Sequence, residues 1–249
     1  MKENKNKVAL VTGANKGIGF ETSRQLAQQE MTVLLSARDK VRGTEAADKL
    51  KAEGLDVQFL HLDVDDVKTH EAAYKFIEEN FGWLDILINN AGILADQFED
   101  GKSALTSQTP VETYRRTFET NFFNLIALTQ TLLPLIKKSD AGRIVNLSSI
   151  LGSLSIHSDP DGDFYHFKVP AYDASKTALN AYTIHLAYEL RDTPIKVNSA
   201  HPGYVATDMN NHEGPMPVED GAKTSVALAM LPSDGFTGKF IHLGEEVPW

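Results

Sequence analysis

The feature that most constrains the fold is a glycine-rich turn between an apolar run and a helical pattern. Residues 8–12 (Val-Ala-Leu-Val-Thr) are apolar and β-branched, which is typical of a short buried strand. Gly13, Gly17 and Gly19 follow, and the pattern over residues 20–29 is helical. Glycines let the backbone approach a pyrophosphate closely, and a helix N-terminus offers free N–H groups. The order therefore predicts a nucleotide-binding loop, with a turn that binds nothing as the alternative.

The remainder of the chain repeats the alternation of strand and helix with short turns, which is the pattern of a parallel sheet covered on both faces. No repeat, low-complexity run or linker divides it. We therefore predict one α/β domain over residues 1–249, a Rossmann fold with a doubly wound parallel sheet of about seven strands. The predicted strands are residues 8–12, 32–37, 57–62, 84–88, 142–149, 195–200 and 238–243. The predicted helices are residues 20–29, 39–53, 67–81, 111–137 with a kink near Pro134, 172–191 and 218–231.

Composition excludes several classes of function. The net charge of −10 argues against nucleic acids, anionic membranes and acidic carrier proteins as partners. The chain has no cysteine, so thiol chemistry and cysteine-ligated metals are excluded, and we expect no metal site. Neither a signal peptide nor a membrane-spanning run of apolar residues is present, so we expect a cytoplasmic protein.

Two cations stand where a nucleotide-binding fold of this kind chooses between its cofactors. The end of the second strand faces the adenosine ribose, and an acid there binds a 2′-hydroxyl whereas a cation accommodates a 2′-phosphate. Here the strand ends in Ala37 and Arg38, and Lys16 adds a second cation in the glycine turn. Each cation alone could be an ordinary surface charge. Together they favour NADP(H) over NAD(H).

Tyr172 and Lys176 lie four residues apart at the start of a predicted helix, so both side chains face the same way. A phenol and an ammonium lose their protons near pH 10 when unperturbed. A positive charge beside a phenol favours the phenolate, so Lys176 is expected to lower the pKa of Tyr172 into a range useful for acid–base catalysis. The spacing alone also arises by chance on amphipathic helices.

The three motifs together resemble the short-chain dehydrogenase/reductase family over essentially the whole chain. They are the loop at residues 12–19 (Thr-Gly-Ala-Asn-Lys-Gly-Ile-Gly), the turn at residues 89–92 (Asn-Asn-Ala-Gly) and the Tyr-x-x-x-Lys helix. The loop is most similar to that of NADPH-dependent carbonyl reductases. The resemblance implies that NADP(H) is bound by Gly13, Asn15, Lys16, Gly17, Ile18, Gly19, Arg38, Asp63, Val64, Asn90, Ala91, Gly92, Tyr172, Lys176, Pro202, Gly203, Val205 and Thr207.

The same resemblance implies a catalytic set of four residues. Ser149, the second serine after the fifth strand, would orient the substrate carbonyl, and Ser148 is the alternative that only ends the strand. Tyr172 would exchange the proton and Lys176 would tune it. Asn121 would hold a water through its backbone carbonyl, while its side chain could equally be a buried amide bonded to backbone. The implied reaction is reversible reduction of ketones or aldehydes to alcohols.

Three further segments carry predictions. Residues 157–168 form an insertion before Tyr172, and Phe164 and Tyr165 within it are expected to wall the substrate pocket. Its aspartates do not complete a calcium loop. Residues 208–217 form a short lid, which implies an open pocket. His201 precedes a proline at a strand end, and we assign it to packing rather than catalysis.

Other functions share some of these motifs. A ketoacyl-carrier-protein reductase shares all of them but fits the acidic chain poorly. An extended-family epimerase uses a different glycine spacing and a larger C-terminal domain, and a sensor that only binds NADP(H) would have lost the four catalytic residues. The expected partner is a small carbonyl or alcohol substrate. Relatives are often dimers or tetramers, and a monomer stays open.

Overall fold

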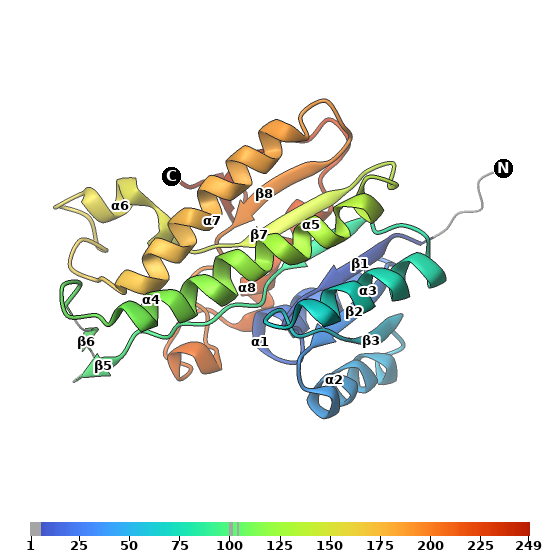
Figure 1. Cartoon of the computed structure of the whole chain (residues 1–249), viewed down its shortest axis with the longest axis horizontal. Coiled ribbons are helices and arrows are strands. Elements are labelled where there is room, and N and C mark those ends of the chain that lie inside the picture. Colours follow the sequence, from blue (N-terminus) through green and yellow to red (C-terminus); the bar gives the residue numbers. More distant parts are fainter. Residues whose placement is uncertain (1–5, 100–101, 104) are drawn as a thin grey trace.

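An eight-stranded sheet forms the centre of the molecule (Figure 1). The computed structural model describes residues 6–99, 102–103 and 105–249. The strand order is β10-β9-β8-β7-β4-β1-β2-β3, and all neighbours are parallel except the terminal pair β9 and β10. The strands are β1 (Val8–Val11), β2 (Thr32–Ala37), β3 (Val57–His61), β4 (Ile86–Asn89), β7 (Arg143–Leu147), β8 (Lys196–Ala200), β9 (Phe240–His242) and β10 (Glu245–Glu246). The seven predicted parallel strands are confirmed, and β10 is a short antiparallel addition.

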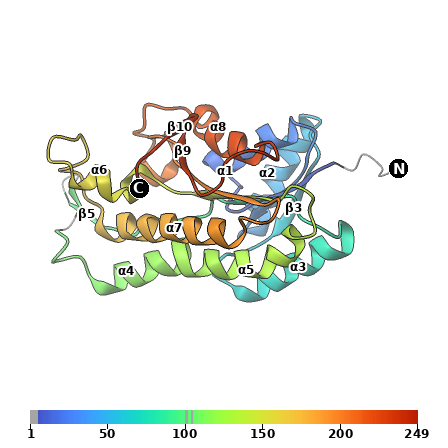
Figure 2. The ribbon, with the colours of Figure 1, turned by 90° about the horizontal axis from the view of Figure 1, so that it is seen from above.

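Helices cover both faces of this sheet, so the doubly wound fold is confirmed (Figure 2). One face carries α1 (Gly17–Ala27), α2 (Lys40–Ala52) and α8 (Val218–Ala229). The other carries α3 (Val67–Asn80), α4 (Val111–Phe118), α5 (Asn124–Ile136) and α7 (Pro170–Glu189). Asp39 and Asp66 cap α2 and α3 by accepting hydrogen bonds from first-turn N–H groups.

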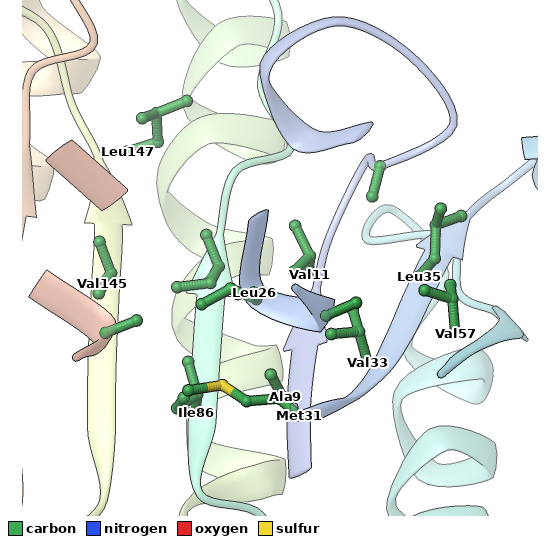
Figure 3. Close-up of a cluster of buried hydrophobic side chains, with 14 of the residues drawn as sticks. Ala9, Val11, Leu26, Met31, Val33, Leu35, Val57, Ile86, Val145 and Leu147 are labelled. Atoms are coloured by element: carbon green, nitrogen blue, oxygen red, sulfur yellow. The ribbon is translucent and has the colours of Figure 1, made fainter. Parts of the chain in front are cut away.

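Successive side chains of a strand point to opposite faces of the sheet, so the sheet has a hydrophobic core on each face. Ala9 and Val11 of β1 point into the cluster beneath α1, α2 and α8, together with Leu26 (Figure 3). Val8 and Leu10 point the other way, into the cluster beneath α3, α5 and α7. Because β1 is buried on both faces, it is a continuous apolar run rather than an alternating one.

The helix predicted over residues 111–137 is interrupted, but not at the place predicted. It continues through Pro134 to Ile136, whereas Glu119–Phe123 between α4 and α5 form a π-helical turn. A π turn accommodates one more residue than an α turn and changes the direction of the side chains around it. The helix is therefore not broken at Pro134, where a kink stays a prediction, and the irregular turn surrounds Asn121.

The segment after β4 contains two short paired strands, β5 (Phe98–Glu99) and β6 (Lys102–Ser103). The helix α6 (Leu154–Ser158) runs into the insertion, whose turns end at α7. The hairpin, α6 and the first turns of α4 and α7 lie at one end of the molecule (Figure 1). Among the described helices none is long and apolar enough to cross a membrane.

Candidate active site

Ser149 and Tyr172 meet beside the carboxyl end of β7. Ser149 directly precedes the 3₁₀ turn Ile150–Gly152, and its hydroxyl is hydrogen-bonded to the phenol of Tyr172. Lys176 lies one helical turn further along α7, with Nζ 5.6 Å from the centre of the Tyr172 ring. Its ammonium donates to the carbonyl oxygen of Leu147 at 2.7 Å. Ser148 points away and donates to Asn180 at 2.6 Å, which favours the assignment of Ser149.

The ionisation of Tyr172 differs from the expectation. Burial raises its pKa to about 12, the hydrogen bond from Ser149 opposes this rise, and the charge of Asp173 adds to it. The charge of Lys176 is not among these causes, and its ammonium donates to the Leu147 carbonyl, so the lowering expected from Lys176 stays a prediction. Burial also lowers the pKa of Lys176 to about 8. The phenol is therefore a protonated donor at neutral pH in the protein's own environment.

Asn121 lies in the π turn and its side chain is fully buried. Its amide accepts from the N–H of Ile93 at 2.8 Å and donates to the carbonyl of the same residue at 2.9 Å. Nδ2 also lies 3.1 Å from Oγ of Ser175, which donates to the carbonyl of Tyr172. The interpretation of the side chain as a buried amide bonded to backbone is confirmed. Asn121 thereby joins the segment after β4 to the helix of Tyr172.

The glycine turn and the Asn-Asn-Ala-Gly turn are fastened to one another. The side chain of Asn90 donates to the carbonyls of Thr12 at 2.7 Å and Gly13 at 3.2 Å. In return the hydroxyl of Thr12 accepts from the N–H groups of Asn90 and Ala91. A Cβ on Gly19 would come within 2.4 Å of the Asn90 amide, so this close approach requires glycine.

The first turn of α1 fits an anion. Its N-cap, Lys16, makes no side-chain hydrogen bond to the helix, and the turn contains no acidic residue. The N–H groups of a first turn have no partner within their own helix. Gly17 adopts a φ of +57°, a conformation that favours glycine. With Ile18 and Gly19, this turn can hold a pyrophosphate at its N–H groups.

The residues predicted for the adenosine half stand around this turn. Arg38 directly follows β2 and is exposed, and Asp63 and Val64 follow β3. Lys16 is also largely exposed, but its ammonium binds the carboxylate of Asp208 at 2.5 Å. A cation expected to meet a 2′-phosphate is thus paired with an acid from the segment predicted as the lid.

The segment from Pro202 to Thr207 continues from the end of β8. Gly203 has a φ of +93°, and Val205 is buried and bridges to Met216. The side chain of Asn210 accepts from the N–H of Thr207 at 3.0 Å and donates to the carbonyl of Val205 at 2.9 Å. These contacts hold the backbone of the predicted nicotinamide segment against the base of the lid.

His201 connects this segment to Ser149. Its Nδ1 accepts from the N–H of Ile150 at 3.2 Å and of Gly203 at 3.4 Å. Burial, and secondarily His242, lower its pKa to about 3. A ring that stays neutral and receives two backbone N–H groups is a structural acceptor, in agreement with the packing role assigned to it.

Side-chain contacts connect the insertion to α7. Nζ of Lys168 lies 2.9 Å from Nδ1 of His157, and Nε2 of His157 lies 3.5 Å from the carboxylate of Asp173. Tyr165 packs edge-on against His166 and beneath Lys168. The role of Phe164 and Tyr165 as pocket walls stays a prediction.

Two acidic residues in this region were not predicted from the sequence. Asp65 accepts from Thr120 at 3.1 Å and from Asn124 at 3.0 Å, which ties the loop after β3 to the π turn. Asp96 accepts from two N–H groups of α7. The sequence held a signal for Asp96, since Val169 before α7 and Pro170 at its start have no side chain that can cap the helix.

The protein is a nucleotide-binding α/β protein of the Rossmann type, as indicated by the parallel sheet, the glycine turn and the Ser149–Tyr172 pair. The family model described as short chain dehydrogenase matches residues 7–217. The chain belongs to the short-chain dehydrogenase/reductase family, in its carbonyl-reductase-like branch.

Relatives with characterised names are similar over nearly their full length. Salutaridine reductase of Papaver bracteatum is 36% identical, with 97% of this chain and 96% of that protein covered. A (+)-neomenthol dehydrogenase of Arabidopsis thaliana is 37% identical, with 93% and 94% covered. Carbonyl reductase [NADPH] 3 of Mus musculus is 35% identical, with 92% of each covered.

Solved structures of short-chain dehydrogenases and reductases have a similar fold. Salutaridine reductase from Papaver somniferum has a TM-score of 0.81 and 32% identity, covering 94% of this chain and 99% of that one. A short chain dehydrogenase from Shigella flexneri complexed with NADP has a TM-score of 0.81 and 28% identity, covering 96% and 97%. Family membership establishes an oxidoreductase of the kind that acts on carbonyl or alcohol substrates.

Proposed function

We propose that this protein is an NADPH-dependent carbonyl reductase that converts ketones or aldehydes to alcohols, reversibly. The observation that carries the proposal is the hydrogen bond between Ser149 and Tyr172 at the carboxyl end of β7. Two hydroxyls at this point can hold one carbonyl oxygen and protonate it. The names of a carbonyl reductase [NADPH] and of a structure complexed with NADP support the choice of cofactor.

NADPH, when bound, supplies the hydride for the carbonyl carbon. The pyrophosphate is assigned to the first turn of α1, and the 2′-phosphate to Lys16 and Arg38. Ser149 Oγ donates to the carbonyl oxygen and fixes its position. Oη of Tyr172 gives its proton to that oxygen as negative charge develops there. A pKa of about 12 keeps this proton in place at neutral pH, which suits reduction better than oxidation.

Lys176 and Asn121 complete the proposed set. Lys176 keeps a positive charge near the phenol at neutral pH and is assigned to the nicotinamide ribose. The backbone carbonyl of Asn121 is assigned to a water that returns a proton toward Tyr172. The buried side-chain contacts of Asn121 support this assignment, because they fix the turn that presents the carbonyl.

The test is NADPH consumption, followed by absorbance, with a panel of cyclic and open-chain ketones and aldehydes. Tyr172→Phe is expected to lower kcat by about a thousandfold, because it removes the proton donor. The Kd for NADPH, measured by fluorescence titration, should change by less than about threefold.

Tyr182→Phe is the matched control. Tyr182 lies on the same helix, burial also raises its pKa to about 12, and its hydroxyl is bonded to Thr129 away from Ser149. The Tyr182→Phe variant should keep the kcat of the wild type. Activity retained by Tyr172→Phe would refute the mechanism, and a wild-type protein that binds NADPH but consumes none with any carbonyl would refute the enzyme.

A further inference from the structure

The helix that carries Tyr172 lacks a cap of its own. An α-helix leaves its first N–H groups without partners, and the residue before it usually supplies a side-chain acceptor. Here that residue is Val169, which has no polar side chain, and Pro170 follows. Pro170 has no N–H, so the groups that need acceptors are those of Ala171 and Tyr172.

Asp96 supplies both acceptors from the segment after β4. Its Oδ1 accepts from the N–H of Ala171 and its Oδ2 from the N–H of Tyr172, each at 3.0 Å. Asp96 is 8% exposed, and these contacts span 75 and 76 residues of chain. A hydrogen bond to an ionised carboxylate is shorter and stronger than one between two neutral groups.

Asp173 completes the arrangement from within the helix. Its Oδ2 accepts from the N–H of Val169 at 2.9 Å, so the residue before the helix is also bonded. In a common capping box one residue before the helix and one in its first turn exchange these bonds. Here the acceptors come from two parts of the chain. Asp173 within the helix bonds the N–H of Val169, whereas Asp96 in the segment after β4 bonds the N–H groups of Ala171 and Tyr172.

Two sets of contacts fix the segment after β4, one to the π turn and one to the helix of the catalytic tyrosine. Ile93 is held on both its N–H and its carbonyl by Asn121. Three residues later, Asp96 holds the N–H of Tyr172 itself. The backbone that leaves the Asn-Asn-Ala-Gly turn is therefore fixed first to the π turn and then to α7.

We propose that Asp96 is a positioning residue for the reaction, which sets where Tyr172 stands relative to Ser149 by capping α7 at that residue. This inference rests on the proposed function for its kinetic part. Asp96 touches neither substrate nor cofactor in this proposal. It acts through the backbone of Tyr172, and a small displacement of a proton donor reduces turnover steeply.

The variants are Asp96→Asn, which keeps the shape and one acceptor, and Asp96→Ala, which removes both. Asp85→Asn and Asp85→Ala are the matched controls. Asp85 is also 8% exposed, and its carboxylate accepts from the backbone N–H of Val8, the indole of Trp83 and the hydroxyl of Ser139. It stands before β4, at the opposite end of the strands from Tyr172.

The first measurement is amide hydrogen exchange, which needs no turnover. Asp96→Asn should speed exchange at Ala171 and Tyr172 by roughly five- to tenfold, the loss typical of an N-cap, while Asp85→Asn should leave both amides unchanged. Unchanged protection of Ala171 and Tyr172 in Asp96→Asn would overturn the cap.

The second measurement is kinetic, on variants shown by thermal melting to be folded at the assay temperature. Asp96→Asn should lower kcat about tenfold and Asp96→Ala further, with the Kd for NADPH within about twofold. The solvent deuterium isotope effect on kcat should rise, because proton transfer from a displaced phenol becomes slower. Asp85→Asn should keep kcat and its isotope effect even if its melting temperature falls as much.

The two proposals fail in different ways. A wild-type protein that reduces no carbonyl refutes the proposed function, and the exchange measurement then still decides the cap. A wild-type reductase whose Asp96 and Asp85 variants lose kcat equally refutes the positioning role and leaves the function intact. If Asp96→Ala does not fold, Asp96→Asn alone carries the comparison with Asp85→Asn.

Discussion

The two ends of the proposed cofactor site are built differently. At the nicotinamide end Asn121 is fully buried and Lys176 is 4% exposed, and both side chains are bonded to backbone. At the phosphate end the side chain of Lys16 is 58% exposed and Arg38 lies on the surface. One end consists of groups fixed by folding, and the other of long side chains that water surrounds.

This difference assigns separate properties to the two ends. A buried, bonded group cannot be changed without affecting the positions of its neighbours, so the chemistry of the nicotinamide end is coupled to stability. An exposed cation can be replaced at little cost to the fold. Cofactor preference is therefore expected to change more freely than the reaction itself.

The largest effect on cofactor binding is expected from Arg38→Asp, which tests the phosphate end. Loss of a charge-assisted contact and added repulsion should weaken NADPH binding by about 1.5–3 kcal/mol, roughly tenfold to a hundredfold, with NADH much less affected. The ratio of kcat/KM values for the two cofactors measures this. Arg191→Asp, an exposed site beyond the end of α7, is the charge-matched control. A wild-type enzyme that prefers NADH would refute the assignment.

Asp173→Asn tests the cost of charge at the buried end. Burial, with the charge of Asp96 adding to it, raises the pKa of Asp173 to about 7. The folded protein thus holds a proton that the unfolded chain releases near pH 4, so stability from this group is complete below pH 4 and is lost as pH rises through 7.

Asparagine keeps the acceptor for Val169 and carries no charge. The variant should be more stable than the wild type at pH 8, by on the order of 1 kcal/mol because water reaches part of the carboxyl group, and should lose this advantage at pH 4. Urea unfolding at both pH values measures the difference. An advantage of equal size at both would show that ionisation is not its cause.

The smallest effect is expected from Asp208→Asn. The Lys16 ammonium must leave Asp208 to reach a phosphate, so removing the acid should tighten NADPH binding by roughly two- to threefold. NADH affinity should not change, and the gain should shrink in high salt. Fluorescence titration at two salt concentrations tests this. A weaker NADPH complex in the variant would mean that Asp208 supports the site.

Local pattern was sufficient for the fold, whereas the choice of Ser149 as the partner of Tyr172 came from the resemblance to a known family. Residues close together in the sequence specify the strand period, the glycine turns and the four-residue spacing of Tyr172 and Lys176. Asp96, Asp65 and the acceptor role of His201 depend on contacts between distant segments, which no local pattern specifies. The hydrogen bond from Lys176 to the Leu147 carbonyl was not predicted for a related reason, since the four-residue spacing places two side chains on one face but does not fix where an ammonium points.

The π turn limits how this chain can change in length. Glu119–Phe123 contain one residue more than an α-helical turn would place there, and Asn121 faces Ile93 and Ser175 only in that register. Deleting one residue from this turn would restore a regular helix and rotate α4 relative to α5 by about 100°. Surface turns such as those of residues 159–166 can gain or lose residues, whereas this helix cannot be shortened by one without separating its two ends from their contacts.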